Sequence, residues 1–320
     1  MEKPINYRAA WEGVCLVGFG RHARDKLLPG LHAAGLKATG IVSAKPYLDM
    51  ADVQLFRTVT DAISCLPKTT LFVVASPPNI HYSQVKALLE AGRDVFVEKP
   101  AFLSLHDSVK LGRLATQHKV VLAEMLMYLE NKVVKQIIDE LRCKAGSVKT
   151  IDCKFLIPSV PHGTFRTEAS LGNSLLSDMA CYPLSMLAIA GYDLSNLFLV
   201  EGTEKEKNSS IFFVKGRTKQ ADINIHVGCN GYYQNRVKIE FDDDREISCE
   251  PFFYGREGNR TLIKKTKRFE VVETVSEYNA YELMFLRKRP EWIATQKRRL
   301  EALKVVSTSL ERLGKQAGLL

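Results

Sequence analysis

The chain has 320 residues and a formal net charge of +9; 46% of its residues are hydrophobic and 25% are charged. This length exceeds one average domain and predicts two, with the composition of an ordinary globular protein. No run of about 18 uncharged apolar residues occurs. Residues 1–13 lack the apolar core of a secretory signal. We therefore expect no membrane insertion and no export.

The seven cysteines are scattered along the chain, and none forms a C-x-x-C pair. An odd number of cysteines without paired spacing predicts reduced thiols and a cytoplasmic location. The same spacing argues against a zinc site, so we expect no metal ion.

The basic residues concentrate in the last third of the chain. They occur in short runs at 264–268, 287–289 and 297–299, which Glu and apolar residues interrupt. Such runs are typical of a solvated face, and their positive field would also attract an anionic cofactor or substrate. They carry no nucleic-acid-binding motif, so we expect no nucleic-acid partner.

Short apolar strands alternate with helical patterns over the first 124 residues. Strands are expected at 14–17, 38–42, 71–75, 95–97 and 120–123, and helices at 27–34, 61–65, 82–91 and 105–118. We expect Asp61 to cap the second of these helices. The rhythm predicts a parallel sheet with right-handed crossovers, that is, an α/β Rossmann domain over residues 1–124.

The pattern changes after residue 125. A helix is expected at 131–141, strands at 148–157, 209–214, 221–227, 236–241 and 269–275, and a final amphipathic helix at 300–313. Period-two alternation predicts a mostly antiparallel sheet with one covered face. Residues 125–320 are therefore expected to form an α+β domain that binds the substrate and supports oligomerisation.

A glycine-rich turn follows the first strand. Residues 18–23 read Gly18-Phe19-Gly20-Arg21-His22-Ala23, a G-x-G-x-x-A form of the dinucleotide fingerprint. Its first glycine permits a tight turn, and its second lets the backbone approach a pyrophosphate at the helix N-terminus. The turn therefore predicts a dinucleotide site.

The end of the second strand favours NADP over NAD. NAD-binding domains usually carry Asp or Glu here to bind the ribose hydroxyl. This chain instead has Ser43 and Lys45. We expect Ser43 to hydrogen-bond a 2′-phosphate and Lys45 to neutralise it, although NAD stays possible.

Three further segments resemble the Gfo/Idh/MocA family of oxidoreductases. They are Ser76-Pro77-Pro78-Asn79-Ile80-His81, then Glu98-Lys99-Pro100, then Leu171-Gly172-Asn173-Ser174 continuing to Asp178-Met179-Ala180-Cys181-Tyr182-Pro183. The last segment resembles the glucose–fructose oxidoreductase branch, which has Tyr where other branches have His. The resemblance implies a Rossmann domain followed by a large open-faced sheet, through which family members form homodimers or homotetramers.

The resemblance also implies the site residues. Lys99 and Tyr182 would manage a proton at the substrate oxygen, with Asp178 orienting either Lys99 or a substrate hydroxyl. We expect burial to lower the pKa of Lys99, and the Lys99 ammonium to bring the Tyr182 phenol closer to ionisation. The cofactor would contact residues of the glycine turn, the second strand and two family motifs: Gly18, Phe19, Gly20, Arg21, Ser43, Lys45, Ser76, Pro77, His81, Glu98 and Lys99.

His81 could instead cap the helix that follows it. His162, Arg166 and Tyr128 are weaker candidates for substrate contacts. Related sugar enzymes often have Arg where this chain has Leu129, and glycines at 173 and 174, so the pocket is expected to differ from that of a typical glucose enzyme.

Together these features predict an NAD(P)-dependent oxidoreductase. It would transfer a hydride between nicotinamide and a C=O or CH–OH of a sugar, sugar nucleotide or related polyol, with the redox chemistry supplied by the cofactor. Two alternatives are a reductase of C=N or other non-sugar bonds, and a non-catalytic NADP-binding regulatory protein. The sequence does not name the substrate.

Overall fold

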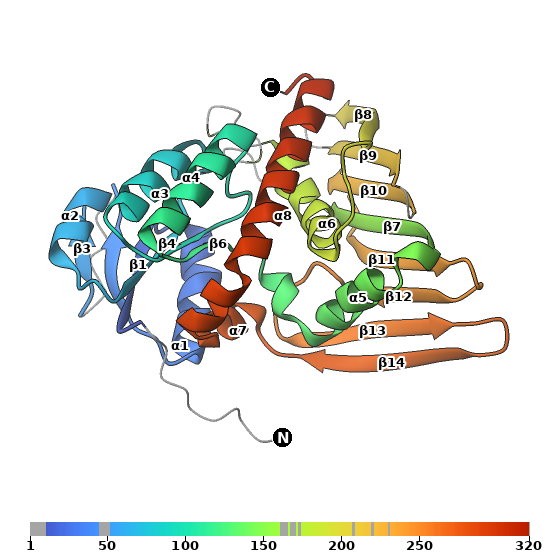
Figure 1. The fold of residues 1–320 in the computed structure, drawn as a ribbon, viewed down its shortest axis with the longest axis horizontal. Helices are drawn as coiled ribbons and strands as arrows, with labels where there is room; N and C mark the ends of the chain where they lie inside the picture. Colours follow the sequence, from blue (N-terminus) through green and yellow to red (C-terminus); the bar gives the residue numbers. More distant parts are fainter. Residues whose placement is uncertain are drawn as a thin grey trace.

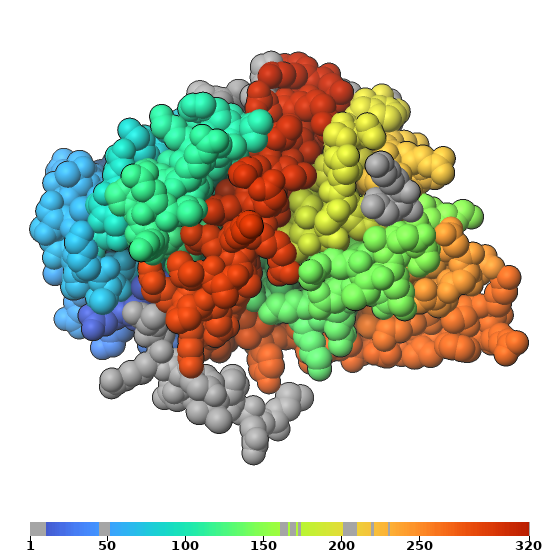
Figure 2. Space-filling view, in the orientation of Figure 1, coloured from blue at the N-terminus to red at the C-terminus, as the bar shows by residue number. Residues whose placement is uncertain are grey.

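A computed structural model of the chain describes residues 11–44, 52–160, 166, 171, 174–206, 209–218, 221–229 and 231–319. Two β-sheets lie side by side, and the C-terminal helix α8 (Arg289–Gln316) crosses the molecule between them (Figure 1). The space-filling view shows this helix as a band across the face of the molecule (Figure 2).

The first sheet has six strands in the order β3-β2-β1-β4-β5-β6, all paired in parallel. The strands are β1 (Gly13–Val17), β2 (Ala38–Val42), β3 (Gln54–Phe56), β4 (Thr70–Val74), β5 (Val95–Val97) and β6 (Leu122–Glu124). Every residue of β1 and β4 is buried. The predicted parallel sheet is confirmed. Its order reverses between β1 and β4, where open α/β sheets bind their ligands.

Helices connect these strands. They are the π-helix η1 (Ala23–Leu27), α1 (Leu28–Ala33), α2 (Val59–Cys65), the short 3₁₀ turn η2 (Pro78–Ile80), α3 (His81–Glu90) and α4 (Leu105–His118). The expected cap of α2 is wrong in one detail. Thr58 is the N-cap, and Asp61 returns a hydrogen bond to the Thr58 backbone, so the two residues form a capping box.

The second sheet has eight strands in the order β14-β13-β12-β11-β7-β10-β9-β8. They are β7 (Val148–Ile157), β8 (Phe198–Glu206), β9 (Ser209–Arg217), β10 (Asp222–Cys229), β11 (Gln234–Phe241), β12 (Glu246–Glu250), β13 (Gly258–Lys265) and β14 (Glu270–Glu277). Within the described strands, β7 and β10 form a parallel pair and the other pairs are antiparallel. The mostly antiparallel sheet is confirmed.

Strands β3, β8, β12 and β13 were not predicted from the sequence. β3 has three residues, all at least partly exposed, and β12 has five. In β13 only two residues are buried. β3 and β8 are edge strands, β12 is short and β13 is mostly exposed, so these strands lack the regular apolar alternation that marks a strand in the sequence.

Helices cover one face of the second sheet (Figure 1). They are α5 (Lys132–Cys143) and α6 (Leu175–Ala190), and the 3₁₀ turns η3 (Met127–Glu130) and η4 (Ala145–Ser147) precede and follow α5. In β11, buried residues alternate with partly exposed ones, as a half-covered sheet requires. The other face carries no helix in the described part of the chain.

Helix α8 packs against both sheets. Leu300 and Leu303 join an apolar cluster on one side of the parallel sheet, whereas Leu310 and Leu313 join a larger cluster that continues from the other side of that sheet into the second sheet. The short helix α7 (Ala280–Leu286) also contacts α1. The expected domain boundary between residues 124 and 125 stays a prediction, because helix α8, at the end of the chain, packs against both sheets.

Candidate active site

The glycine turn lies at the reversal point of the parallel sheet. Gly18 has φ +88°, and a Cβ there would lie 2.7 Å from the backbone nitrogen of Ser76. A Cβ on Gly20 would meet no described atom within 4 Å. Gly18 is therefore required by the protein itself, whereas the space at Gly20 is open to a ligand. This arrangement fits a dinucleotide whose pyrophosphate approaches the turn.

The other predicted cofactor residues lie at the same edge of the sheet. Phe19 is buried and Arg21 is exposed. Ser43 follows β2, and its backbone N–H donates to the Phe56 carbonyl. Ser76, which is half-buried, donates from its hydroxyl to Gln84 at 2.5 Å. Lys45 lies outside the described residues.

A side-chain contact joins the glycine turn to the Glu98-Lys99-Pro100 segment. The Nε2 atom of His22 lies 2.9 Å from Oε1 of Glu98. Burial acts to raise the pKa of Glu98, but His22 and Lys99 outweigh it, so this pKa is lowered. His22 was not predicted as a site residue from the sequence, although its place inside the glycine turn was a usable signal.

Lys99 is held by a buried carboxylate. Its Nζ atom lies 2.6 Å from Oδ1 of Asp178, and Nε of Arg166 lies 2.7 Å from the other oxygen, Oδ2. The Asp178 side chain is 0% exposed. Because both of its oxygens are bound by cations, the geometry fits the orientation of Lys99, one of the two roles predicted for Asp178.

The expected lowering of the Lys99 pKa is wrong. Burial does lower it, but the adjacent Asp178 carboxylate more than compensates, and the pKa of Lys99 is raised above its ordinary value of 10.5. Lys99 therefore stays protonated at neutral pH.

Tyr182 lies next to Lys99, one helical turn after Asp178. The Lys99 ammonium sits 4.6 Å from the centre of the Tyr182 ring, a cation–π contact. Both Asp178 and Tyr182 contact Lys99, which confirms that they share one face of helix α6. Phe155, Tyr128 and Phe253 pack around the same ring.

The expected activation of the Tyr182 phenol is also wrong. Burial raises its pKa well above the ordinary value of 10. Lys99 faces the ring, a geometry that does little to favour ionisation of the hydroxyl. Among the described residues, no hydrogen-bond partner is found for that hydroxyl. Tyr182 is thus a phenol that keeps its proton.

Tyr128 is fully buried, and its hydroxyl lies 2.9 Å from the Tyr182 carbonyl and 2.8 Å from Oγ of Ser185. These contacts support helix α6 and leave no exposed surface on Tyr128. His162 lies outside the described residues. Ser174, which stands where related enzymes have glycine, is the N-cap of α6 and accepts from the Ser177 N–H.

His81 does not cap helix α3. It is 1% exposed, with Nε2 at 2.8 Å from the Ser76 carbonyl and Nδ1 at 3.1 Å from the Ala101 carbonyl. The ring therefore joins the turn after β4 to the turn after β5. The Ala101 N–H donates to Glu124 at the end of β6, another site residue that the sequence analysis missed. An acidic residue at the end of an apolar strand was the signal for it.

Strand order 3-2-1-4-5-6 with a glycine turn after β1 defines a dinucleotide-binding Rossmann protein. Residues 13–125 match the family model described as "Oxidoreductase family, NAD-binding Rossmann fold", the Gfo/Idh/MocA family. This match covers the dinucleotide-binding part of the chain and agrees with the family that the motifs resemble.

Among curated proteins, the chain is similar to reductases of deoxysugar nucleotides. The dTDP-3,4-didehydro-2,6-dideoxy-alpha-D-glucose 3-reductase of Actinomadura kijaniata is 25% identical over 216 residues, 65% of this chain and 64% of the relative. The enzyme of the same name from Streptomyces antibioticus is 31% identical over 137 residues, 42% of each chain. The aligned segments thus span less than two thirds of these relatives.

Solved structures share the fold over nearly the whole chain. The 3-ketoreductase KijD10 of Actinomadura kijaniata, in complex with NADP and TDP-benzene, matches with a TM-score of 0.75 and 17% identity, covering 92% of this chain and 96% of that one. An aldose–aldose oxidoreductase from Caulobacter crescentus, complexed with glycerol, gives a TM-score of 0.78 and 15% identity, covering 96% and 98%. The predicted two-domain fold class is confirmed.

Proposed function

We propose that the chain is an NADP-dependent reductase that transfers a hydride to a carbonyl carbon of a sugar nucleotide. The observation that carries the proposal is the Lys99 ammonium, which Asp178 holds at 2.6 Å beside Tyr182, at the carboxyl edge of a dinucleotide-binding sheet. The names of the curated relatives support a nucleotide-linked sugar within the broader class of sugars and polyols.

NADPH, when bound, would supply the hydride. Lys99 and Tyr182 both have raised pKa values, so both keep a proton at neutral pH. A protonated ammonium and a phenol can donate to a carbonyl oxygen and stabilise the negative charge that develops on it. Neither group is suited to remove a proton from an alcohol, which favours reduction over oxidation.

The test is NADPH oxidation in the presence of a 3-keto sugar nucleotide. We expect Lys99→Met to lower kcat by about 10²-fold or more and Tyr182→Phe by about tenfold or more. Lys86→Met is the matched control, since Lys86 is a partly exposed lysine that pairs with Glu90. Turnover by Lys99→Met at the wild-type rate would refute the assignment.

The two alternative functions are outcomes of the same assay. Reduction of an imine but of no keto sugar would favour the C=N reductase. Tight NADP binding without turnover of any carbonyl or imine would favour the regulatory protein. If the chain is such a regulatory protein, Tyr182→Phe should cause no loss of its function.

We propose NADP over NAD because neither Ser43 nor Lys45 is acidic at the end of β2. The positive charge of Lys45 would offset the 2′-phosphate. We expect Lys45→Ala to weaken NADP binding while leaving NAD binding unchanged. Equal efficiency with both cofactors, together with no effect of this variant, would contradict the preference.

We also propose a cytoplasmic homodimer or homotetramer that forms through the open sheet face. No disulfide joins any of the described cysteines, which supports a reducing compartment. In the described part of the chain, no helix has the length and apolar character needed to cross a membrane. Lys154 and His226 are paired neighbours on the adjacent inner strands β7 and β10. Light scattering should give a dimer or tetramer mass, with a shift toward monomer for Lys154→Glu.

A further inference from the structure

The turn that carries Lys99 is fixed by side chains from three other elements. Oε1 of Glu124, from β6, accepts from the Ala101 N–H at 2.9 Å, and His81, from α3, contacts the Ala101 carbonyl at 3.1 Å. Ser307, from α8, donates to the Phe102 carbonyl at 3.1 Å. Both backbone polar groups of Ala101, two residues after Lys99, are thus bound by buried side chains.

Glu124 is placed to control this turn. It is the last residue of β6 and pairs with Val97 of β5, the residue before Glu98 and Lys99. It is 9% exposed. A carboxyl held this close to the Lys99 turn acts on it both by hydrogen bonding and by charge.

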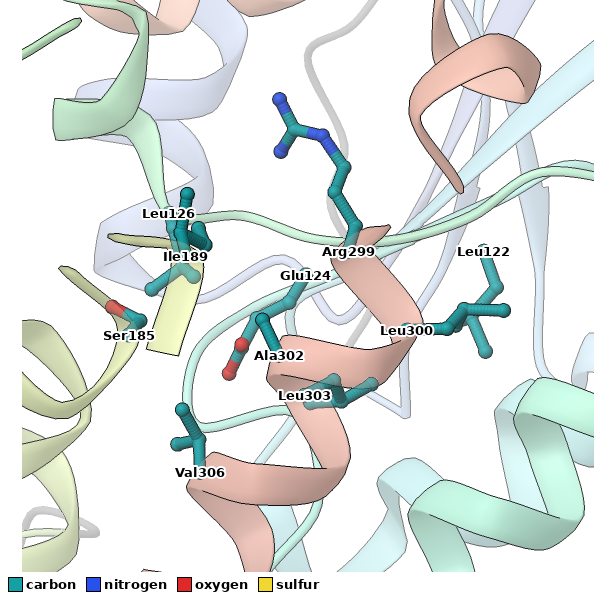
Figure 3. A pocket seen from close by; sticks show the side chains of 10 residues that line it. All are labelled: Leu122, Glu124, Leu126, Ser185, Ile189, Arg299, Leu300, Ala302, Leu303 and Val306. Carbon is teal, nitrogen blue, oxygen red and sulfur yellow. The ribbon is translucent and has the colours of Figure 1, made fainter. Parts of the chain in front are cut away.

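A small cavity lies against Glu124. It measures about 20 Å³, and Ser185 and Arg299 share its wall with Glu124 and seven apolar side chains (Figure 3). This volume holds about one water molecule. Figure 3 shows the Glu124 carboxyl on the side of helix α8, among Ala302, Leu303 and Val306. Part of the carboxyl thus binds the turn, and the cavity leaves room for a water beside it.

We propose that Glu124 is a positioning residue for Lys99. Its carboxyl holds the Lys99-Pro100-Ala101 turn through the Ala101 N–H, so that the Lys99 ammonium stays between Asp178 and the Tyr182 ring. The role of Lys99 in the reaction rests on the proposed function. The fixing of the turn by Glu124 does not depend on that function.

The protonation state of Glu124 affects the charged groups around it. Glu98 and Lys99 act on it from the turn after β5, Cys181 interacts with it from α6, and Arg299 lines the shared cavity from α8. Burial raises the pKa of Glu124 to about 7, against the opposing effects of the Ala101 N–H and Lys99. With Glu124 neutral, Lys99 and Arg166 balance Asp178 and Glu98. Ionised Glu124 adds a negative charge that binds the Lys99 proton more tightly.

The test compares three variants. Glu124→Gln keeps an acceptor for the Ala101 N–H but cannot ionise. Glu124→Leu removes the acceptor. Leu122→Ala, on the same strand and the same cavity wall, enlarges the cavity without touching the turn. Thermal unfolding of all three variants reports any general loss of stability.

The first readout is hydrogen exchange at residues 98–102, which needs no substrate. We expect faster exchange in Glu124→Leu and near wild-type exchange in Glu124→Gln and Leu122→Ala. Unchanged exchange in Glu124→Leu would overturn the proposal. If exchange is faster in Glu124→Leu but the wild-type chain reduces no substrate, the proposal that Glu124 holds the turn stands and only the proposed function is refuted.

The second readout is kcat against KM and pH. We expect Glu124→Leu to lower kcat by about 10²-fold with KM for NADPH unchanged, as for a misplaced catalytic group. In the wild-type enzyme we expect kcat to fall as the pH rises through about 7, where Glu124 ionises. Glu124→Gln should keep kcat within about threefold of wild type and should not show this fall. A Glu124→Leu enzyme with wild-type kcat, or a Glu124→Gln enzyme with the wild-type pH step, would overturn the proposal.

Discussion

Two cations meet one buried carboxylate at Asp178. Lys99 and Arg166 bind its two oxygens, and the side chain has no exposed surface. Burial acts to raise the pKa of Asp178, but the two cations outweigh it and hold the pKa below its ordinary value of 3.8. A carboxyl whose pKa is lowered by folding stabilises the protein above that ordinary value. This stabilisation is lost as the pH falls through the folded value.

Asp178→Asn should therefore destabilise the fold in a pH-dependent way. The variant leaves Lys99 and Arg166 beside a neutral amide, and we expect the free energy of unfolding at about pH 7 to fall by about 3 kcal/mol. The difference from wild type should shrink below about pH 4, where Asp178 takes up a proton in the unfolded state, and should vanish at the lower pH where it takes one up in the folded state. Urea unfolding at the two pH values measures both effects.

Asp139→Asn serves as the control, because Asp139 is an exposed partner of Arg142. It should change stability by less than about 0.5 kcal/mol. If Asp178→Asn lowers the free energy of unfolding equally at both pH values, the ionised Asp178 carboxylate is not the source of the stabilisation.

At the scale of elements, the turn from β1 into η1 separates a structural glycine from a ligand-facing one. Gly18 has a positive φ and lies against the Ser76 backbone, which is not free to move aside. Gly20 has open space where its Cβ would be. Gly18 is therefore required by the backbone conformation and packing of the protein, whereas Gly20 leaves space for a ligand.

The matched pair Gly18→Ala and Gly20→Ala should separate these constraints. Gly18→Ala forces a left-handed backbone and a steric clash, and we expect it to lower stability by about 2 kcal/mol and to weaken NADP binding. Gly20→Ala should leave the melting temperature unchanged and weaken NADP by about tenfold or more, because the added methyl occupies the approach of the pyrophosphate. Thermal unfolding and fluorescence titration measure the two effects. Wild-type NADP affinity in Gly20→Ala would place the cofactor elsewhere.

At the scale of the whole molecule, Glu130 ties the C-terminal helices to the start of the second domain. Its side chain is 2% exposed, and its carboxylate is bound by Arg287 and Arg299 at 3.0 Å and by Lys135 at 2.9 Å. Arg287 and Arg299 also make cation–π contacts with Trp292, at 4.2 and 4.5 Å from its ring centre. The pKa of Glu130 is lowered because these cations outweigh its burial.

Glu130→Ala should leave Arg287 and Arg299 without their shared anion. We expect a loss of about 3–5 kcal/mol in the free energy of unfolding. Because α8 belongs to both apolar clusters, the loss should appear in a single calorimetric transition. Glu301→Ala, an exposed partner of Lys304, is the control and should be near neutral. Two separate transitions, with only one shifted, would show that the domains unfold independently.

The sequence by itself determined the elements with strong periodicity. The strands at 38–42 and 148–157 and the helix at 105–118 lie where their apolar spacing predicts. The glycine turn and the segments around Lys99 and Tyr182 also predicted the family and placed the catalytic candidates. Local spacing fixes these features because each depends on residues that are close in the chain.

Only the tertiary structure decided the electrostatics of the site. Lys99 meets Asp178 across 79 positions of sequence, and this contact reverses the pKa change that burial alone would cause. Glu124 and His81 reach Ala101 from two other elements. A pKa depends on every charge and on the depth of burial in three dimensions, and a single sequence specifies neither.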